Sequence, residues 1–132
     1  MKRIVETDIQ KANSLIKMAK ITLERLETMD IMKYPSNSLD DYYDIIHQLS
    51  ESICCINGLK FSGDGAHAEL LNFIFSNKFG FGESEKLFIQ ELRVLRNRIS
   101  YEGFFIQEEY LARNKTKIEN IIDKLIKIGA SV

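Results

Sequence analysis

The chain has 132 residues, of which 45% are hydrophobic and 28% charged, a composition typical of a folded domain and not of a disordered segment. One proline and seven glycines are too few for the turns of a β-sandwich or barrel, and there is no apolar run long enough to span a membrane. The net charge of −1 gives no overall attraction to nucleic acids or membranes. The polar first residues lack a signal-peptide core, so we expect a cytoplasmic protein with a single domain, residues 1–132.

Apolar residues recur at helical spacing along the first part of the chain. Their intervals of three and four residues place one apolar stripe on a helix of about seven turns. The members of this stripe are Val5, Ile9, Ala12, Ile16, Ala19, Leu23 and Leu26. The segment 34–37 contains Pro35 and should end this helix. A second helix is expected to begin with Ser38 as its N-cap and to end at Gly58.

Three more helices are predicted in the rest of the chain. A short one follows the glycine-rich loop and would be capped by Asp64. A fourth is expected over about 84–101, closed by Gly103, and a fifth over about 107–128, with Gly129 after its end. No segment alternates with a period of two. The sequence therefore predicts an all-α, up-and-down bundle of four long helices plus one short helix.

The two cysteines, Cys54 and Cys55, are adjacent in the sequence. Neighbouring side chains on a helix point about 100° apart, so these thiols cannot comfortably bridge or chelate one metal ion. We interpret them as buried structural thiols, and we expect no metal site and no cofactor.

The most unusual local feature is a basic polar cluster near the end of the fourth predicted helix. Arg93, Arg96, Asn97 and Ser100 share one side of that helix. An arginine fork of donors matches a phosphate group, which makes Arg93, Arg96 and Ser100 candidate ligand-binding residues. The alternative is that Arg96 and Asn97 only tie the helix end to a neighbouring helix. The stretch 37–70, in contrast, holds six acidic residues and one lysine.

A second polar stripe lies on the second predicted helix. Asp40, Asp44, His47 and Glu51 follow each other at spacings of four, three and four residues. An acidic neighbour would raise the pKa of His47 and orient its ring. The alternative is a solvated helix face with internal ion pairs. The other histidine, His67, falls in the first turn of the short helix, where a local capping role is expected.

Two segments carry a family resemblance. Residues 43–60, followed by Gly65-Ala-His67, form an apolar helix, a glycine turn and a histidine at the start of the next helix. Residues 95–103 contain Arg96-Asn97 near the end of a later helix. Both resemble the HEPN family, the helical domain named for nucleotide binding in higher eukaryotes and prokaryotes. The long first and last helices also fit, so the resemblance covers almost the whole chain.

The resemblance implies a homodimer in which the two fourth-helix motifs face each other across a cleft. In active family members this cleft cleaves RNA without a metal ion. By position, Arg96 would hold the scissile phosphate and Asn97 would order the site. Tyr101 stands where the family has a histidine, and no histidine follows it. A phenol with a pKa near 10 is a poor general base, so the resemblance implies binding more strongly than catalysis.

These residues and the resemblance are compatible with three functions. The first is a HEPN-like protein that binds RNA or nucleotide at an Arg-Asn cleft, as the partner of a small nucleotidyltransferase in a toxin–antitoxin type pair, with Tyr101 as the acceptor hydroxyl. The second is a metal-independent ribonuclease in which Arg96 and Asn97 act with Tyr101 or His47. The third is a structural helical adaptor.

The expected dimer rests on the resemblance, with one additional feature of the sequence. The residues 104–106, Phe-Phe-Ile, follow the end of the fourth helix and form a candidate contact patch. They are equally compatible with a turn that packs back onto its own core.

Overall fold

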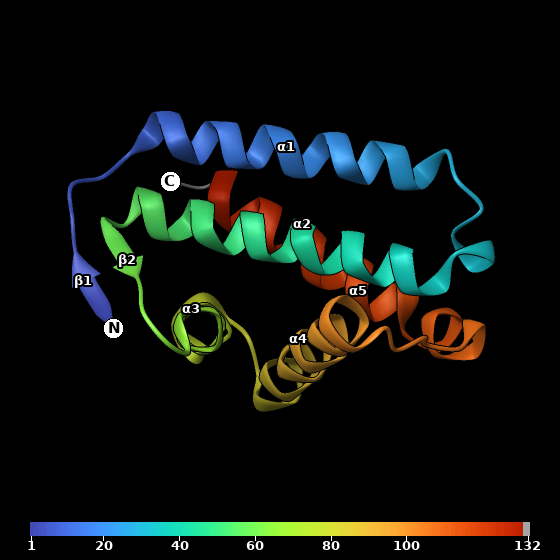
Figure 1. Ribbon diagram of the computed structural model, residues 1–132. Helices are drawn as coiled ribbons and strands as arrows, with labels where there is room; N and C mark the ends of the chain where they lie inside the picture. The colour runs from blue at the N-terminus through green and yellow to red at the C-terminus, as the bar shows by residue number, and fades with distance from the viewer. Residues whose placement is uncertain (131–132) are drawn as a thin grey trace.

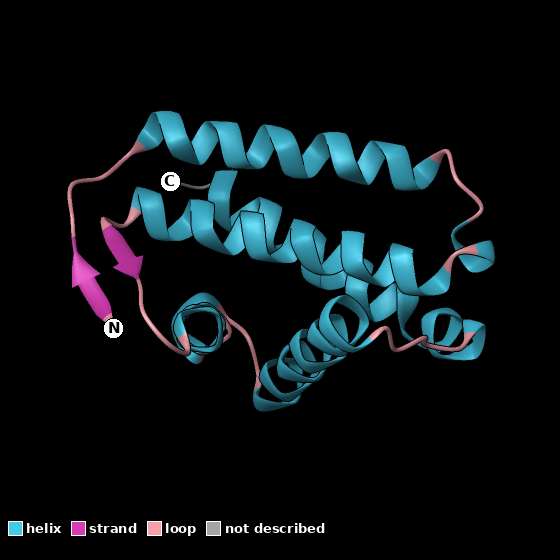
Figure 2. Cartoon of the chain, viewed as in Figure 1, coloured by secondary structure: helices cyan, strands magenta, loops and turns pink. Residues whose placement is uncertain are grey.

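The computed structural model describes residues 1–130 and is mainly helical (Figures 1 and 2). Its helices are α1 (Ile9–Glu27), α2 (Pro35–Ile56), α3 (Ala66–Ile74), α4 (Glu83–Glu102) and α5 (Glu108–Ala130). Two short strands, β1 (Lys2–Ile4) and β2 (Leu59–Phe61), form an antiparallel pair. The predicted set of four long helices and one short helix is confirmed.

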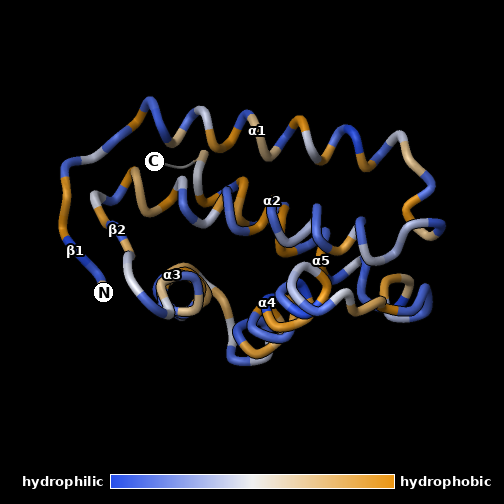
Figure 3. Tube along the Cα trace, viewed as in Figure 1, coloured by the Kyte–Doolittle hydropathy of each residue, from blue (hydrophilic) through white to orange (hydrophobic). Residues whose placement is uncertain are grey.

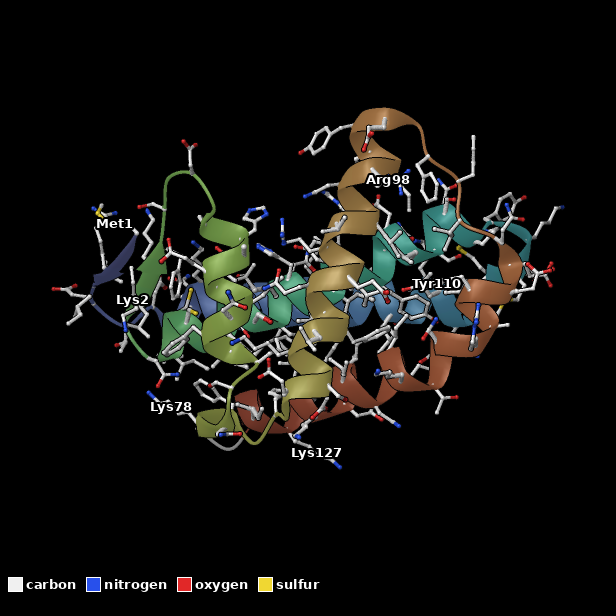
Figure 4. All side chains as sticks on the ribbon, turned by 90° about the horizontal axis from the view of Figure 1, so that it is seen from below. Met1, Lys2, Lys78, Arg98, Tyr110 and Lys127 are labelled. Carbon is white, nitrogen blue, oxygen red and sulfur yellow. The ribbon has the colours of Figure 1, made fainter. Side chains whose placement is uncertain are left out.

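Helix α2 lies at the centre of the molecule and contacts each of the other four helices. In Figure 1, α1 lies along α2 on one side, while α3 and α4 lie on the other side and are viewed almost end-on. Figure 4, turned by 90°, shows α4 upright across the direction of α1 and α2. The fold is thus a helical bundle, but α3 and α4 cross α2 steeply. The predicted helical bundle is confirmed, but α3 and α4 do not follow the predicted up-and-down arrangement.

The hydrophobic core is built around α2, whose apolar residues are buried on several sides. Figure 3 shows apolar and polar residues alternating along α1 and α2, as expected for amphipathic helices. The α2 side chains with 1% exposure or less include Leu39, Ile45, Ile46, Leu49 and Ile53. Burial of each such side chain contributes roughly 1.5–3 kcal/mol. This core fixes the orientation of the polar residues on the remaining face of α2.

The start of α1 differs from its prediction because of a side-chain cap. Asp8 accepts a hydrogen bond from the backbone N–H of Lys11 at 2.9 Å, so the helix begins after Asp8. Val5 therefore lies before the helix, where its N–H donates to the carbonyl of Gly58 at 2.8 Å. The strand pair, with Lys2 opposite Phe61, was not predicted because three residues are too few to show a period of two.

The start of α2 also differs from its prediction. Pro35 occupies the first turn, where the missing N–H of proline costs nothing. Ser38 consequently lies inside the helix instead of capping it, and its buried hydroxyl donates to the carbonyl of Ile31 at 3.0 Å. The predicted Ser38 cap was wrong.

Two smaller predictions at helix ends were also wrong. The residue at the N-cap of α3 is Gly65, in the left-handed conformation, and Asp64 does not cap that helix. Helix α5 continues through Gly129 to Ala130 instead of ending before Gly129. The predicted left-handed glycines at the ends of α2 and α4, Gly58 and Gly103, are confirmed by φ angles of 66°. Within residues 1–130, no helix has the length and apolar character needed to cross a membrane.

Candidate functional site on α2, α3 and α4

Arg96 connects α4 to the polar stripe of α2. Its Nε donates to Oδ1 of Asp40 at 2.8 Å, and Nη2 lies 3.5 Å from Oδ1 of Asp44. Burial alone would lower the pKa of Arg96, but the hydrogen bond to Asp40 and the charges of Asp44 and Asp40 raise it. Arg96 therefore joins α4 to a neighbouring helix, as one of the two interpretations of the sequence proposed.

The pKa of Asp44 reflects the presence of two carboxylates beside one guanidinium. Burial and the negative charge of Asp40 raise the pKa of Asp44, and the positive charge of Arg96 opposes this shift only in part. The opposite charges of the 37–70 stretch and the arginine cluster therefore do meet in the fold, at this seam between α2 and α4.

The ring of Tyr43 packs against the guanidinium of Arg96. Its ring centroid lies 5.7 Å from the Cζ atom of Arg96, within the range of a cation–π contact. Only 2% of the residue is exposed, and its buried hydroxyl has no hydrogen-bond partner among residues 1–130. Burial raises the pKa of Tyr43 to about 12, against the lowering effect of Arg93 and Arg96. The phenol is therefore protonated at neutral pH and can donate a hydrogen bond.

His47 continues the same stripe one turn beyond Tyr43. Its ring centroid lies 4.4 Å from that of His67 on α3, and its Nδ1 lies 4.0 Å from Oε2 of Glu51. Burial, together with the charge of His67, lowers the pKa of His47 to about 4, although Glu51 acts in the opposite direction. Glu51 thus acts in the expected direction, but the net shift of the pKa of His47 is downward, because desolvation outweighs a carboxylate 4.0 Å away.

His67 also differs from its prediction. It lies in the first turn of α3 as expected, but it packs its ring against His47 instead of capping the helix. His47 lies on α2 and His67 on α3, so their contact joins these two helices. Helix α4 borders the same surface through Arg96.

Arg93 lies one turn before Arg96 and is linked to α3. Its Nε donates to Oε1 of Gln90 at 2.8 Å. The amide of Gln90 in turn donates to Oδ1 of Asn72 at 2.9 Å and to the carbonyl of Ala68 at 3.2 Å. This chain of hydrogen bonds links Arg93 through Gln90 to α3.

The remaining predicted site residues are more peripheral. Asn97 is partly buried, and its side chain makes no hydrogen bond within the described part of the chain, so its predicted tie to a neighbouring element is not formed. Ser100 is exposed. Tyr101 has 78% of its surface exposed at the last turn of α4. The structure thus brings Arg93, Arg96 and His47 to one surface, and leaves Tyr101 at its outer end.

The sequence missed two members of this surface, Tyr43 and Gln90. Tyr43 is four residues before His47, and this spacing gave the available signal, because residues four apart share one face of a helix. Gln90 is three residues before Arg93 on α4, which is also one helical turn. Both residues looked like ordinary parts of amphipathic helices, and only the crossing of α2, α3 and α4 shows their partners.

The two cysteines lie away from this surface and agree with their predicted structural role. Both are free and buried. Burial raises the pKa of Cys54 to about 12, and burial also raises the pKa of Cys55. Within the described residues, no group of three or more His, Cys, Asp or Glu side chains is placed to hold a metal ion.

Comparison of the chain with family models, with curated proteins and with solved structures gives no match. The function is therefore inferred from the chemistry of the surface formed by α2, α3 and α4.

Proposed function

We propose that this chain is a HEPN-like protein that binds RNA or a nucleotide through phosphate contacts at the arginine surface of α4. The observation that supports this proposal is that the Arg96 guanidinium has N–H donors left over after its ion pairs are made. It has five N–H donors, and Asp40 and Asp44 accept from only two of them, so three are left for a ligand. The side chain is 23% exposed, so a phosphate oxygen can reach these donors.

The neighbours of Arg96 fit an anionic ligand with polar groups. Arg93 lies on the same side of α4 and supplies a second positive charge. The Arg96 guanidinium lies over the ring of Tyr43, which limits its directions and lowers the entropy lost on binding. The carboxylates of Asp40 and Asp44 repel an anion, so we expect moderate affinity that decreases with added salt.

A homodimer is part of this proposal. Leu87, Val94 and Tyr101 are large exposed side chains at intervals of seven residues along α4. Residues seven apart lie on one side of a helix, so these three form an apolar stripe on the outer side of α4, nearly opposite Arg96. Packing of two such stripes would join two copies of the chain through α4. Light scattering at micromolar concentration should give twice the monomer mass, and a monomer mass would contradict the dimer.

Tyr101 is the proposed acceptor for a nucleotide transferred by a small nucleotidyltransferase partner. Its phenol oxygen would attack the α-phosphate of ATP, forming an O–P bond as pyrophosphate leaves, and the phenolic proton would pass to solvent. The high exposure of Tyr101 supports access by a second enzyme. Intact mass after incubation with the partner and ATP should increase by one AMP group in the native chain and not in Tyr101→Phe.

The main experiment compares RNA and nucleotide binding by the native chain with binding by Arg96→Ala. Arg25→Ala is the matched control, because Arg25 also pairs with an aspartate, Asp41, at 2.7 Å but on α1. Arg96→Ala should weaken binding about tenfold or more, as expected for loss of a charge-assisted contact, and Arg25→Ala should not. Equal binding by all three proteins, or binding by none, would contradict the proposal and favour a structural adaptor.

Metal-independent RNA cleavage is a second candidate function, favoured by the contact between His47 and His67 beside Arg96. The neutral imidazole of His47 and the adjoining ring of His67, near an arginine, are groups that can transfer protons during phosphodiester cleavage. Cleavage of single-stranded RNA in EDTA should then be lost in both Arg96→Ala and His67→Ala. Activity that persists in Arg96→Ala would indicate a contaminating nuclease.

A further inference from the structure

The turn between α4 and α5 holds one aromatic side chain in solvent. The N–H of Phe104 donates to the carbonyl of Arg98 at 3.2 Å, and the N–H of Ile106 donates to the buried hydroxyl of Ser36 at 3.0 Å. The turn is therefore anchored on both sides of Phe105, which is nevertheless 77% exposed. The side chain of Phe105 therefore contributes little to the core, and its ring is accessible to a ligand. Of the predicted contact patch at 104–106, only Phe105 is left free by the fold.

Phe105 borders an open cleft of about 450 Å³. Its apolar wall is formed by Leu95, Phe104, Ile106 and Tyr110, and polar groups of Gln107, Glu109 and Arg113 complete the lining. Figure 4 shows Arg98 near the α4 end of this turn and Tyr110 near its α5 end. The hydroxyl of Tyr110 donates to Oε2 of Glu91 at 2.8 Å, so its ring is held in place.

Flat groups are already stacked beside this cleft. The Cζ atom of Arg98 lies 3.9 Å from the ring centroid of Phe104, which is the distance of a close cation–π contact. Tyr101, also exposed, is four residues before Phe105 in the sequence. Exposed aromatic rings and guanidinium planes are the groups on which unpaired nucleobases stack.

We propose that this cleft, defined by Phe104, Phe105 and Tyr110, holds an unpaired nucleobase of the RNA or nucleotide whose phosphate contacts Arg96. A base has two flat faces for the rings, and polar edges for the amide of Gln107 and the guanidinium of Arg113. A purely aliphatic ligand would leave these polar groups without partners. The inference rests on the proposed function, and it specifies the ligand as single-stranded.

The probe is a short single-stranded RNA that contains 2-aminopurine, whose fluorescence decreases when it stacks on an aromatic ring. We compare the native chain with Phe105→Ala, Phe105→Trp and the control Ile21→Ala, which shortens an exposed side chain on α1. Circular dichroism verifies that each variant is folded. The native chain and Ile21→Ala should quench the fluorescence. Phe105→Ala should lose the quenching and bind about 5- to 150-fold more weakly, and Phe105→Trp should restore both.

Two results would overturn the base site while leaving the proposed function intact. One is Phe105→Ala binding and quenching like Ile21→Ala. The other combines two observations: the native protein binds RNA without quenching, and Phe105→Ala changes the mass from dimer to monomer. That combination would assign the cleft to a second copy of the chain. Absence of any RNA binding by the native protein is a different result, and it would remove the proposed function and the base site together.

Discussion

Arg96 on α4 and Asp40 on α2 are 56 positions apart in the sequence, yet Nε and Oδ1 are joined by a hydrogen bond of 2.8 Å. The contact holds the guanidinium over Tyr43 and also occupies one of its donors. Asp40 therefore has two opposed effects on an anionic ligand, because it orients the arginine and repels the anion. Substitution of Asp40 separates the two effects.

Asp40→Asn should strengthen RNA or nucleotide binding up to about fivefold, because it removes a negative charge and retains an oxygen that can accept from Arg96. The free energy of unfolding should fall by at most about 1 kcal/mol, as is usual for partly exposed ion pairs. Fluorescence anisotropy at two salt concentrations measures the first effect, and urea unfolding the second. Asp41→Asn, which affects the Arg25 pair on α1, is the control. Weaker binding by Asp40→Asn would show that orientation by Asp40 outweighs its repulsion.

His47 should make the stability of the fold depend on pH. Its pKa is about 4 in the folded state and near its ordinary value of 6.5 in the unfolded state, so the unfolded state binds more protons between these values. The stabilising effect is complete above pH 6.5 and is lost as the pH falls toward 4, by up to about 3 kcal/mol. Urea unfolding from pH 7.5 to pH 4 should show this decrease. It should be smaller in His47→Gln, and an identical profile in that variant would contradict the assignment.

Gly58 should be sensitive to any side chain. Its φ is +66°, and a Cβ atom would lie 2.6 Å from the carbonyl oxygen of Val5, the residue whose N–H bonds to Gly58. Gly63 is the matched control, because its φ is +85° but nothing lies within 4 Å of its Cβ position. Gly63→Ala should cost about 1–2 kcal/mol from backbone conformation alone. Gly58→Ala should cost more, since the strand pair must also shift, and equal melting temperatures would show that the contact relaxes freely.

Cys54 and Cys55 should react slowly with a thiol reagent in the folded protein. Both are buried, and burial raises the pKa of each thiol, which lowers the fraction of reactive thiolate. Labelling with a chromogenic disulfide at pH 7.5 should be slow without denaturant and rapid in guanidinium chloride. Cys54→Ala leaves Cys55, the more exposed of the two thiols, to be tested separately. Rapid labelling of the native chain would contradict the structural role.

The helices were predictable because their apolar spacing is regular, and the ends at Gly58 and Gly103 followed from the conformational freedom of glycine. The start of α2 was not predictable from Ser38, because Pro35 fits the first turn and Ser38 finds the Ile31 carbonyl only in the folded chain. Local capping rules do not include such tertiary contacts.

The candidate site was predictable in its composition but not in its arrangement. The spacing on each helix placed Arg93 and Arg96 on one face, and Asp40, Asp44 and His47 on another. Whether these faces meet depends on the angle at which α4 crosses α2, and helical periodicity carries no information about that angle. The pKa of His47 was misjudged for a related reason, since the packing of α3, not the sequence neighbour Glu51, determines its burial.

The central position of α2 has a consequence for the dynamics of the chain. Because each of the other helices packs on α2, the amide protons of α2 become accessible only when the surrounding contacts open. Hydrogen exchange should therefore be slowest in the middle of α2, at a rate set by global unfolding. The outer turns of α4, which carry Tyr101, should exchange by local fraying. The slowest-exchanging backbone thus supports the aspartates and His47, whereas Tyr101, the proposed acceptor, lies on more rapidly opening structure.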